Sequence, residues 1–504
     1  MIMKRIVSLM IAVLLLMGMF TGCGGQTSNA GATTTKPNTP EENIYEGIGN
    51  DPYADYTVSG TVVVAIDTAR ATDYQPAIDA LREAYPDIDL QVDYYSHTTE
   101  DNASEYLISR ASVGKLPDVV FDEAGRLPLY ISQGWVYPLN EFVEGDPVLE
   151  DVPENFLEDY TYGGKLYALP NGLTFQTIAL NIDLLDEMNL DHPELDWTFA
   201  DYEELMKEAT NNKYSGTDTL HTMEHWGAGI LGENVTLAGY NYETRSFQMT
   251  ESFAESLKLM RSLRTKVAGL EAWSLSTTSG SSGKSDYEIK FGLTYSGATK
   301  HEPFYQGMTL SCLETGTWSR KLLTEKCNFE WELWPVPQNP DAPGKLPMHV
   351  DHSFMTSTAA YPDAAFQVLR FLTYSVEGNL ARLDAYEEEN EGLYDLNGPY
   401  YIPATLNEEV AEKFSNLIEV DEAAVYMYEN MGNSFRADPK KIVPGWTNVD
   451  QTVIMPASGK VTDGQADALA TCAELETKAT EALKEYWDDF EEKLAKVQAD
   501  FENA

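Results

Sequence analysis

The sequence predicts an α/β fold built on parallel sheets. Short apolar runs, typical of buried strands, alternate in the first part of the chain with segments whose apolar residues recur at helical spacing. Strands that alternate with helices form parallel sheets with right-handed crossovers. The chain has 504 residues, which is too long for one compact core, so we expect two or more lobes.

The expected order of the first lobe is strand, helix, strand, helix, strand. Apolar runs predict the first strand at residues 61–66 and the third at 119–121, and alternating apolar and polar residues predict the second at 88–94. Helical spacing predicts helices at 75–85 and 104–114. Together these elements predict one parallel sheet.

Polar residues directly follow two of these strands. Asp67 ends the first strand, and Glu123 and Arg126 come just after the third. Because the carboxyl ends of parallel strands meet at one edge of a sheet, where open α/β sheets hold their ligands, these three side chains are candidate ligand-binding residues. The alternative is that they are solvated loop residues or are paired with one another.

The amino-terminal segment has the features of a secreted protein. Two basic residues precede a mostly apolar run at residues 6–20, which is shorter than the ~20 residues of a membrane-spanning helix and fits a signal peptide over residues 1–22. Small residues then lead to Cys23, as in the bacterial lipobox, although Phe20 stands where Leu is usual. We therefore expect a lipidated Cys23 at the start of a flexible tether over residues 23–56; the alternative is an ordinary signal peptide with an incidental cysteine.

The charge of the chain restricts its partners. The net charge is −47, and removal of residues 1–22 takes away Lys4 and Arg5 and no acidic residue, which changes it to −49. Such a charge repels phosphate backbones, so we expect no nucleic-acid partner. Hydrophobic residues make up 43% of the chain, which favours a globular protein over a disordered one.

The sequence predicts no metal site and no cofactor. Beyond Cys23 there are three cysteines, none in a CxxC spacing, so that one pair or none can form a disulfide. The histidines that lie near one another along the chain lack a metal-binding motif. The cysteines are Cys312, Cys327 and Cys472, and the histidines are His221, His225, His349 and His352.

Three later segments have clear local signals. Paired glycines predict a hairpin or turn within residues 162–170, and Thr198 is a candidate N-cap of the following helix. Residues 463–501 predict one long helix with a single apolar face. That face is expected to comprise Leu469, Cys472, Leu475, Ala479, Leu483, Tyr486, Phe490, Leu494 and Val497.

Seven motifs occur in one order along the chain: PDVVFDEA…QGWVYPL, GKLYALP, ALNIDLLDEMNL, WTFADYEELMKEA, CLETGTWS, WELWPVPQ and YPDAAFQVLRFLT. In this order the chain resembles the bacterial extracellular solute-binding proteins, and more narrowly the maltodextrin-type sugar-binding branch that feeds ABC importers. The resemblance implies a periplasmic-binding-protein-like α/β fold of two lobes with a ligand cleft between them. It places the N-terminal lobe at residues 57–173 plus 350–398 and the C-terminal lobe at 174–349 plus 399–504.

The resemblance also implies aromatic and polar ligand contacts. Flat aromatic rings cover the apolar face of a sugar, and polar side chains bond its hydroxyls. Trp318, in a Gly-x-Trp segment, and Trp446 match cleft aromatics of sugar-binding relatives, and Trp226 is a further candidate. Asp351 is expected at a crossing between the lobes. For each tryptophan the alternative is a packed core residue, and Asp351 could instead cap a strand.

The function that the resemblance implies is a lipid-anchored substrate-binding protein of an ABC transporter. It would be a monomer on the extracellular face of a bacterial membrane, would capture a carbohydrate by hinge closure and would deliver it to the permease subunits. No catalytic role is expected. Two alternatives remain at this point: an extracellular glycoside hydrolase that uses paired carboxylates, and a binding protein for a non-sugar solute such as a peptide or an iron chelate.

Overall fold

The structure is a computed structural model that describes residues 58–96, 102–122, 125–221, 223–277, 284–389, 402–417 and 421–503. All of these residues belong to the compact unit Gly47–Ala504. The expected signal peptide, Cys23, the tether and Glu123 lie outside the described residues. Within the described part, no helix is both long and apolar enough to cross a membrane.

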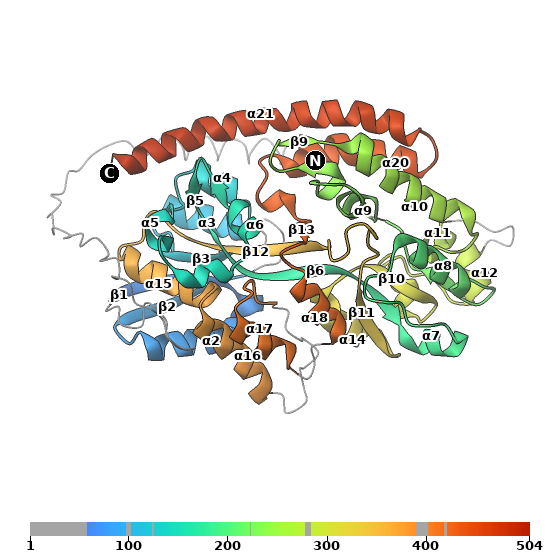
Figure 1. The fold of residues 1–504 in the computed structure, drawn as a ribbon, viewed down its shortest axis with the longest axis horizontal. Helices are drawn as coiled ribbons and strands as arrows, with labels where there is room; N and C mark the ends of the chain where they lie inside the picture. Colours follow the sequence, from blue (N-terminus) through green and yellow to red (C-terminus); the bar gives the residue numbers. More distant parts are fainter. Residues whose placement is uncertain are drawn as a thin grey trace, which may run out of the picture. The chain divides into compact units, whose positions relative to one another are not determined.

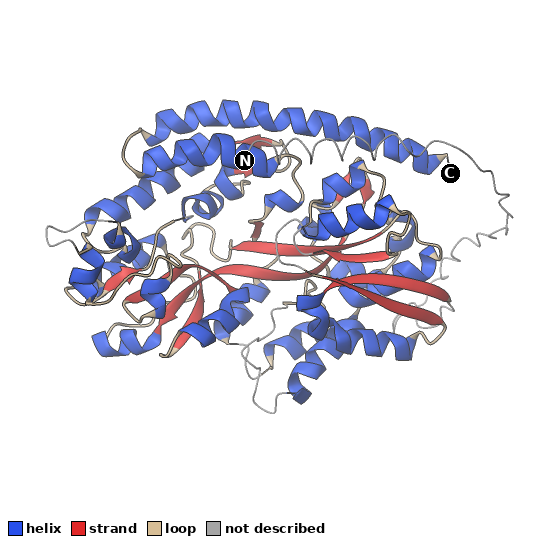
Figure 2. Ribbon diagram, turned by 180° about the vertical axis from the view of Figure 1, so that it is seen from behind, coloured by secondary structure: helices blue, strands red, loops and turns tan. Residues whose placement is uncertain are grey.

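The first strands form the predicted parallel sheet (Figures 1 and 2). Strand β1 (Gly60–Asp67) pairs in parallel with β2 (Ile88–Tyr95) and with β3 (Val119–Asp122). The intervening helices are α2 (Ala71–Ala84) and α3 (Asn102–Ser112). The order strand, helix, strand, helix, strand is therefore confirmed, and the apolar run of β1 lies in the core of this sheet.

Two longer strands extend this sheet. Strand β12 (Pro347–Met355) pairs antiparallel with β3, and β6 (Leu169–Asn181) pairs antiparallel with β12. The short strand β13 (Phe435–Arg436) pairs in parallel with the start of β12. Strands β1, β2, β3 and β12 and residues 169–175 of β6 form what we call the first lobe.

Strand β6 continues into a second set of strands, and Figure 1 shows it running between the two sets. Its residues 176–181 pair antiparallel with β10 (Thr309–Gly316) on one side and with β11 (Trp331–Pro335) on the other. Strand β7 (Ser215–Thr217) pairs in parallel with β10. These strands and residues 176–181 form the second lobe, so one strand belongs to both lobes.

The strand directions turn two carboxyl edges toward each other. Strands β1 and β3 run in the same direction as β6, because both β3 and β6 are antiparallel to β12. Strands β7 and β10 run in the opposite direction to β6. Since β6 runs from the first lobe into the second, the carboxyl ends of β1 and β3 face those of β7 and β10.

Helices cover both sets of strands. Helix α15 (Pro362–Thr373) contacts four strands of the first lobe, and α8 (Phe199–Ala209) contacts β7 and β10 of the second. Thr198 is the N-cap of α8 in a capping box with Asp201, as predicted. Other helices of the described part include α4 (Leu127–Ser132), α6 (Glu154–Glu158), α9 (Met223–Leu231), α10 (Ala254–Lys266), α13 (Glu302–Tyr305), α14 (Arg320–Lys326), α16 (Val376–Glu389), α18 (Glu422–Glu429), α19 (Trp446–Val449) and α20 (Met455–Thr462).

The predicted hairpin is also present. Strands β4 (Thr161–Tyr162) and β5 (Lys165–Leu166) pair antiparallel. Gly163 and Gly164 join them, with φ angles of 56° and 76°. Such left-handed backbone angles favour glycine over any residue with a Cβ.

The predicted long helix is α21 (Ala468–Glu502), and it contacts elements of both lobes. Its buried face differs from the prediction at two positions. Leu469 and Tyr486 are 51% and 38% exposed, and Ala468 and Trp487 are buried instead. The 3.6-residue period lets a neighbour one position away take the inward place, and Trp487 does so by packing against Tyr162 of the hairpin.

A buried ion pair joins helix α15 to the loop before residue 147. Arg370 Nε donates to Asp146 Oδ2 at 2.7 Å, Tyr374 Oη donates to the same oxygen at 2.7 Å, and both charged side chains are 0% exposed. We predict that Asp146→Ala lowers the free energy of unfolding by about 3–5 kcal/mol, because it removes the carboxylate that pairs with a buried guanidinium. Urea denaturation measures this change.

The control for this prediction is Asp488→Ala, which removes an exposed i,i+4 pair with Lys484 on α21. That substitution should change the free energy of unfolding by about 0.5 kcal/mol or less. Equal effects of the two substitutions would contradict the structural role of the buried pair.

Candidate functional site

The carboxyl edge of the first lobe begins at Asp67. This side chain is 2% exposed and caps the turn Thr68–Arg70 by accepting a hydrogen bond from the Ala69 backbone N–H at 2.9 Å. The turn places Arg70 at the same edge, where it is 8% exposed. The predicted residue Asp67 therefore caps the turn that carries Arg70.

Arg70 reaches a residue of β12. Its Nη2 lies 3.6 Å from Asp351 Oδ2, and the other carboxylate oxygen of Asp351 accepts a hydrogen bond from Lys441 Nζ at 2.5 Å. Thus Asp351 pairs with two cations, one from the end of β1 and one from the segment that follows β13. The structure brings the predicted residue Asp351 into a charged cluster with Arg70 and Lys441, beside the turn that Asp67 caps.

Asp438 and Arg436 extend the charged cluster beyond Lys441. Lys441 Nζ also lies 2.8 Å from Asp438 Oδ2, and Asp438 Oδ1 lies 3.5 Å from Arg436 Nε. Burial alone would lower the pKa of Lys441, but the carboxylates of Asp351 and Asp438 outweigh it and raise this pKa. The pKa of Asp438 is lowered, since Lys441 and Arg436 outweigh its burial. Lys441 and Asp438 are therefore both charged at neutral pH.

Trp318 lies beside β12 at the opposing edge. It follows the end of β10, is half-buried, and makes an edge-to-face contact with the ring of His349, with 5.0 Å between the ring centroids. Gly316 makes this position possible, because a Cβ there would overlap the indole. Burial lowers the pKa of His349 to about 4, so this ring is neutral. Trp318 thus contacts His349 of β12, and Asp351 lies two residues further along the same strand.

The carboxyl edge of the second lobe carries further polar side chains. His221 Nδ1 lies 3.1 Å from Glu314 Oε1, and His301 Nε2 lies 3.5 Å from Glu314 Oε2. Burial favours the neutral acid, but the hydrogen bonds with both imidazoles hold the pKa of Glu314 well below its usual range. His301 Nδ1 lies 2.7 Å from Asp218 Oδ2, directly after β7. This edge therefore presents imidazole and carboxylate groups.

Other predicted site residues lie elsewhere. Trp226 is 3% exposed and stacks on Phe199, and Trp446 is 4% exposed and packs against Tyr240 and Phe247. Both indoles therefore contribute to packing, and the structure does not bring them to the facing edges. Arg126 is exposed at the N-cap of α4, after β3.

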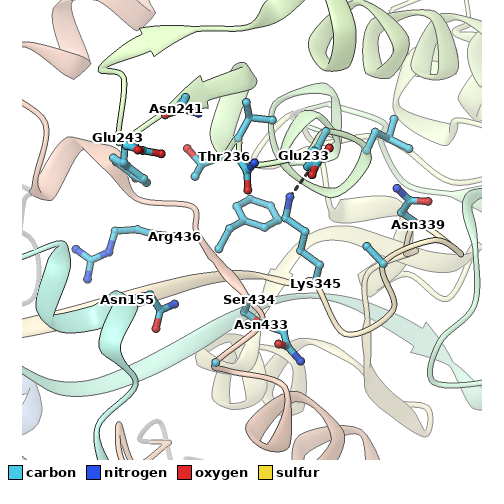
Figure 3. Close-up of a pocket in the computed structure, with 18 of the residues that line it drawn as sticks. Asn155, Glu233, Thr236, Asn241, Glu243, Asn339, Lys345, Asn433, Ser434 and Arg436 are labelled. Atoms are coloured by element: carbon cyan, nitrogen blue, oxygen red, sulfur yellow. Dashed lines mark hydrogen bonds between the residues drawn. The ribbon is translucent and has the colours of Figure 1, made fainter.

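A separate polar cavity of about 790 Å³ lies between α6 of the first lobe and the loop after α9. Figure 3 shows that it is lined mainly by amide, carboxylate, hydroxyl and basic side chains. Lys345 donates to the Gly232 carbonyl at 2.6 Å on this wall, and Arg436 links the cavity to the charged cluster described above. The residues labelled in Figure 3 are Asn155, Glu233, Thr236, Asn241, Glu243, Asn339, Lys345, Asn433, Ser434 and Arg436.

Comparison with known families decides the class of protein. Residues 76–386, more than half of the chain, match the family model described as bacterial extracellular solute-binding protein. The chain belongs to this family. No curated protein sequence matches the chain.

Solved structures of low sequence identity share the fold of this solute-binding protein. An ABC substrate-binding protein from Listeria monocytogenes in complex with cycloalternan is 16% identical, with a TM-score of 0.61, over 84% of this chain and 99% of that chain. The sugar-binding protein MalE from Xanthomonas citri is 15% identical, with a TM-score of 0.62, over 86% and 99%. A cyclic α-maltosyl-1,6-maltose binding protein from Arthrobacter globiformis is 16% identical, with a TM-score of 0.61, over 85% and 100%. The predicted two-lobe α/β fold is confirmed, and the family is one of binding proteins.

Sequence reasoning missed several residues of these edges. Asp218 directly follows β7, much as Asp67 ends β1, so the same rule would have selected it. However, β7 is the short sequence Ser-Gly-Thr and lacks the apolar run of a buried strand. Asp438 and Lys441 lie in a polar segment with no periodic signal, and only the fold shows that it contacts β12.

The cavity gives a pH-dependent prediction. Burial lowers the pKa of Lys345 to about 8, from an ordinary value of ~10.4. Because the folded-state pKa lies below the unfolded value, Lys345 makes the protein more stable as pH rises from about 8 to ~10.4. In a titration of ¹³C-methylated lysines by NMR, the resonance that Lys345→Arg removes should have a midpoint near pH 8. A midpoint near ~10.4 would contradict the burial of this amine.

Proposed function

We propose that this solute-binding protein is the substrate-binding subunit of an ABC transporter and captures a carbohydrate, most simply an oligosaccharide, between the facing carboxyl edges of its lobes. The observation that carries the proposal is the strand arrangement, in which the ends of β1 and β3 face those of β7 and β10. In open α/β sheets ligands bind at such carboxyl edges. Several structures of the same fold are named for bound or recognised sugars, including cycloalternan and mannotriose.

The side chains at these edges suit a sugar. The half-buried indole of Trp318 offers a flat face to the C–H groups of a pyranose ring. Arg70 and Lys441 can donate to hydroxyls, and Asp67 and Asp351 can accept from them. A ligand held in this way contacts both lobes, which is the condition for coupling its binding to closure.

Closure would take place about β6, the strand shared between the lobes. Ligand contacts that form only when the edges approach would shift the population toward the closed form. The closed form would then be recognised by the permease. The cluster of Arg70, Asp351 and Lys441 lies at the junction, so exchange of one of these ion pairs for a ligand hydroxyl would couple binding to lobe position.

We propose no catalytic step. The family consists of binding proteins, and the tryptophan, lysine and arginine side chains at the edges suit retention of a ligand better than cleavage of a bond. Release of sugar from an oligosaccharide by the purified protein would contradict this view and favour a glycoside hydrolase.

The central prediction concerns Trp318. Isothermal titration calorimetry with a panel of maltodextrins, cyclic glucans and manno-oligosaccharides should identify a ligand, and Trp318→Ala should weaken its binding about tenfold, since an aromatic contact of about 1.4 kcal/mol corresponds to that factor. The matched control is Trp331→Ala, because Trp331 is also half-buried but lies at the start of β11, opposite Asn181 and far from the facing edges. It should leave binding unchanged.

A third variant distinguishes ligand binding at the facing edges from ligand binding in the cavity. Asn433 is exposed and lines the cavity, so Asn433→Ala should not change the affinity if the ligand binds at the edges. Weaker binding by Asn433→Ala together with unchanged binding by Trp318→Ala would place the ligand in the cavity and overturn the proposed site.

We further propose that Cys23 carries a lipid that holds the protein on the extracellular face of the membrane. Expressed in a bacterium that processes lipoproteins, the protein should partition into the detergent phase. Cys23→Ala should move it to the aqueous phase, because a two-chain lipid supplies the stable attachment. The control Cys472→Ser replaces a buried cysteine of the folded part and should leave partitioning unchanged, whereas equal partitioning of Cys23→Ala would refute the anchor.

A further inference from the structure

Three potential metal ligands meet at the carboxyl edge of the second lobe. They are Asp218 directly after β7, Cys312 within β10, and His301, which precedes α13. One donor atom from each lies within 4.8 Å of the other two, and Asp218 and Cys312 are 0% exposed. Because the three residues come from separate segments, no sequence motif identifies them as a metal site.

The distances between the donor atoms suit a tetrahedral ion. Cys312 Sγ lies 3.5 Å from His301 Nδ1, and zinc bonds of ~2.3 Å to sulfur and ~2.0 Å to nitrogen at a tetrahedral angle place these atoms about 3.5 Å apart. Asp218 Oδ2 lies 2.7 Å from the same nitrogen. It would have to withdraw by about 0.6 Å to reach the spacing of two zinc ligands.

The surroundings of the cluster hold its members in place. Asp218 Oδ1 accepts hydrogen bonds from the backbone N–H groups of Thr219 at 2.6 Å and Leu313 at 3.1 Å, which leaves Oδ2 turned toward His301. The second ring nitrogen of His301 lies 3.5 Å from Glu314 Oε2. A carboxylate on the outer nitrogen of a ligating histidine is the usual arrangement in zinc sites, because it fixes the ring and raises its basicity.

We propose that Asp218, His301 and Cys312 bind a zinc ion, with a water molecule or a fourth donor completing the coordination. A mixed set of thiolate, imidazole and carboxylate favours zinc over calcium or magnesium, which take oxygen ligands. The ion would tie the segment before α13 to the ends of β7 and β10. The inference does not depend on the nature of the transported ligand.

The competing account is an ion pair without a metal. Burial lowers the pKa of His301, but hydrogen bonds with Asp218 and Glu314 raise it to about 9, so an imidazolium between two carboxylates would also satisfy these groups. In that account Cys312 is a buried thiol that only packs. The two accounts differ in whether the sulfur is a ligand, so the test must detect a metal–sulfur bond.

The experiment uses the mature protein, stripped of metal with a chelator and titrated with Co²⁺ as a spectroscopic substitute for zinc. We expect visible absorption of tetrahedral Co²⁺ and a thiolate-to-cobalt charge-transfer band in the near ultraviolet, both abolished by one equivalent of Zn²⁺. Cys312→Ser should abolish the charge-transfer band. Cys327→Ser and Cys472→Ser should retain it, because those cysteines lie outside the cluster.

Two further variants keep the test interpretable. Glu314→Gln should weaken zinc binding about 10- to 100-fold while keeping the charge-transfer band, as expected for a group that orients a ligand. His301→Gln should abolish tetrahedral cobalt absorption, and circular dichroism of each variant checks that it is folded. Absence of a charge-transfer band in the folded parent protein, or its survival in Cys312→Ser, would overturn the proposal and favour the ion pair.

Discussion

The structure depends on one shared strand. Strand β6 pairs with β12 through its first half and with β10 and β11 through its second half. Its backbone therefore fixes the direction of every strand around it. Because β1 and β3 run along β6 and β7 and β10 run against it, the carboxyl edges of the two lobes must face each other. The place where a ligand can contact both lobes follows from this backbone arrangement.

The junction beside β6 is held by buried charges rather than by apolar packing alone. Arg70, Asp351, Lys441 and Asp438 form a chain of ion pairs in which each member is 8% exposed or less. Desolvation of such charges costs several kcal/mol per ion, and apolar residues of the same volume often give equal or greater stability. Charged groups at this position are therefore better explained by the function of the junction than by stability. In the proposed function they exchange partners when a polar ligand enters.

Much of the fold could be predicted from the sequence, because β1, β2 and β3 carry strong apolar signals and the helices between them have regular spacing. The same rule located Asp67 at the carboxyl edge. It could not locate Asp218, since β7 is too short and polar to be recognised, nor Lys441, whose partner Asp351 is distant in sequence. These contacts are set by the pairing of β6, β12 and β13, which no local pattern encodes.

The tryptophans show the limit of sequence reasoning most clearly. Trp318 and Trp446 both closely follow a glycine in segments that resemble cleft segments of sugar-binding proteins. The structure places Trp318 over Gly316 at the second-lobe edge, whereas Trp446 packs under Tyr240 and Phe247. Tyr240 and Phe247 come from a two-stranded hairpin some two hundred residues earlier, so the burial of Trp446 could be known only once that hairpin was placed in the fold.

A crystal structure of the protein with a bound oligosaccharide tests the central claim most directly. The account predicts one ligand that contacts residues following β1 in the first lobe and Trp318 following β10 in the second. A ligand that touches only one lobe, or one seated in the cavity beside Arg436 and Lys345, would contradict it.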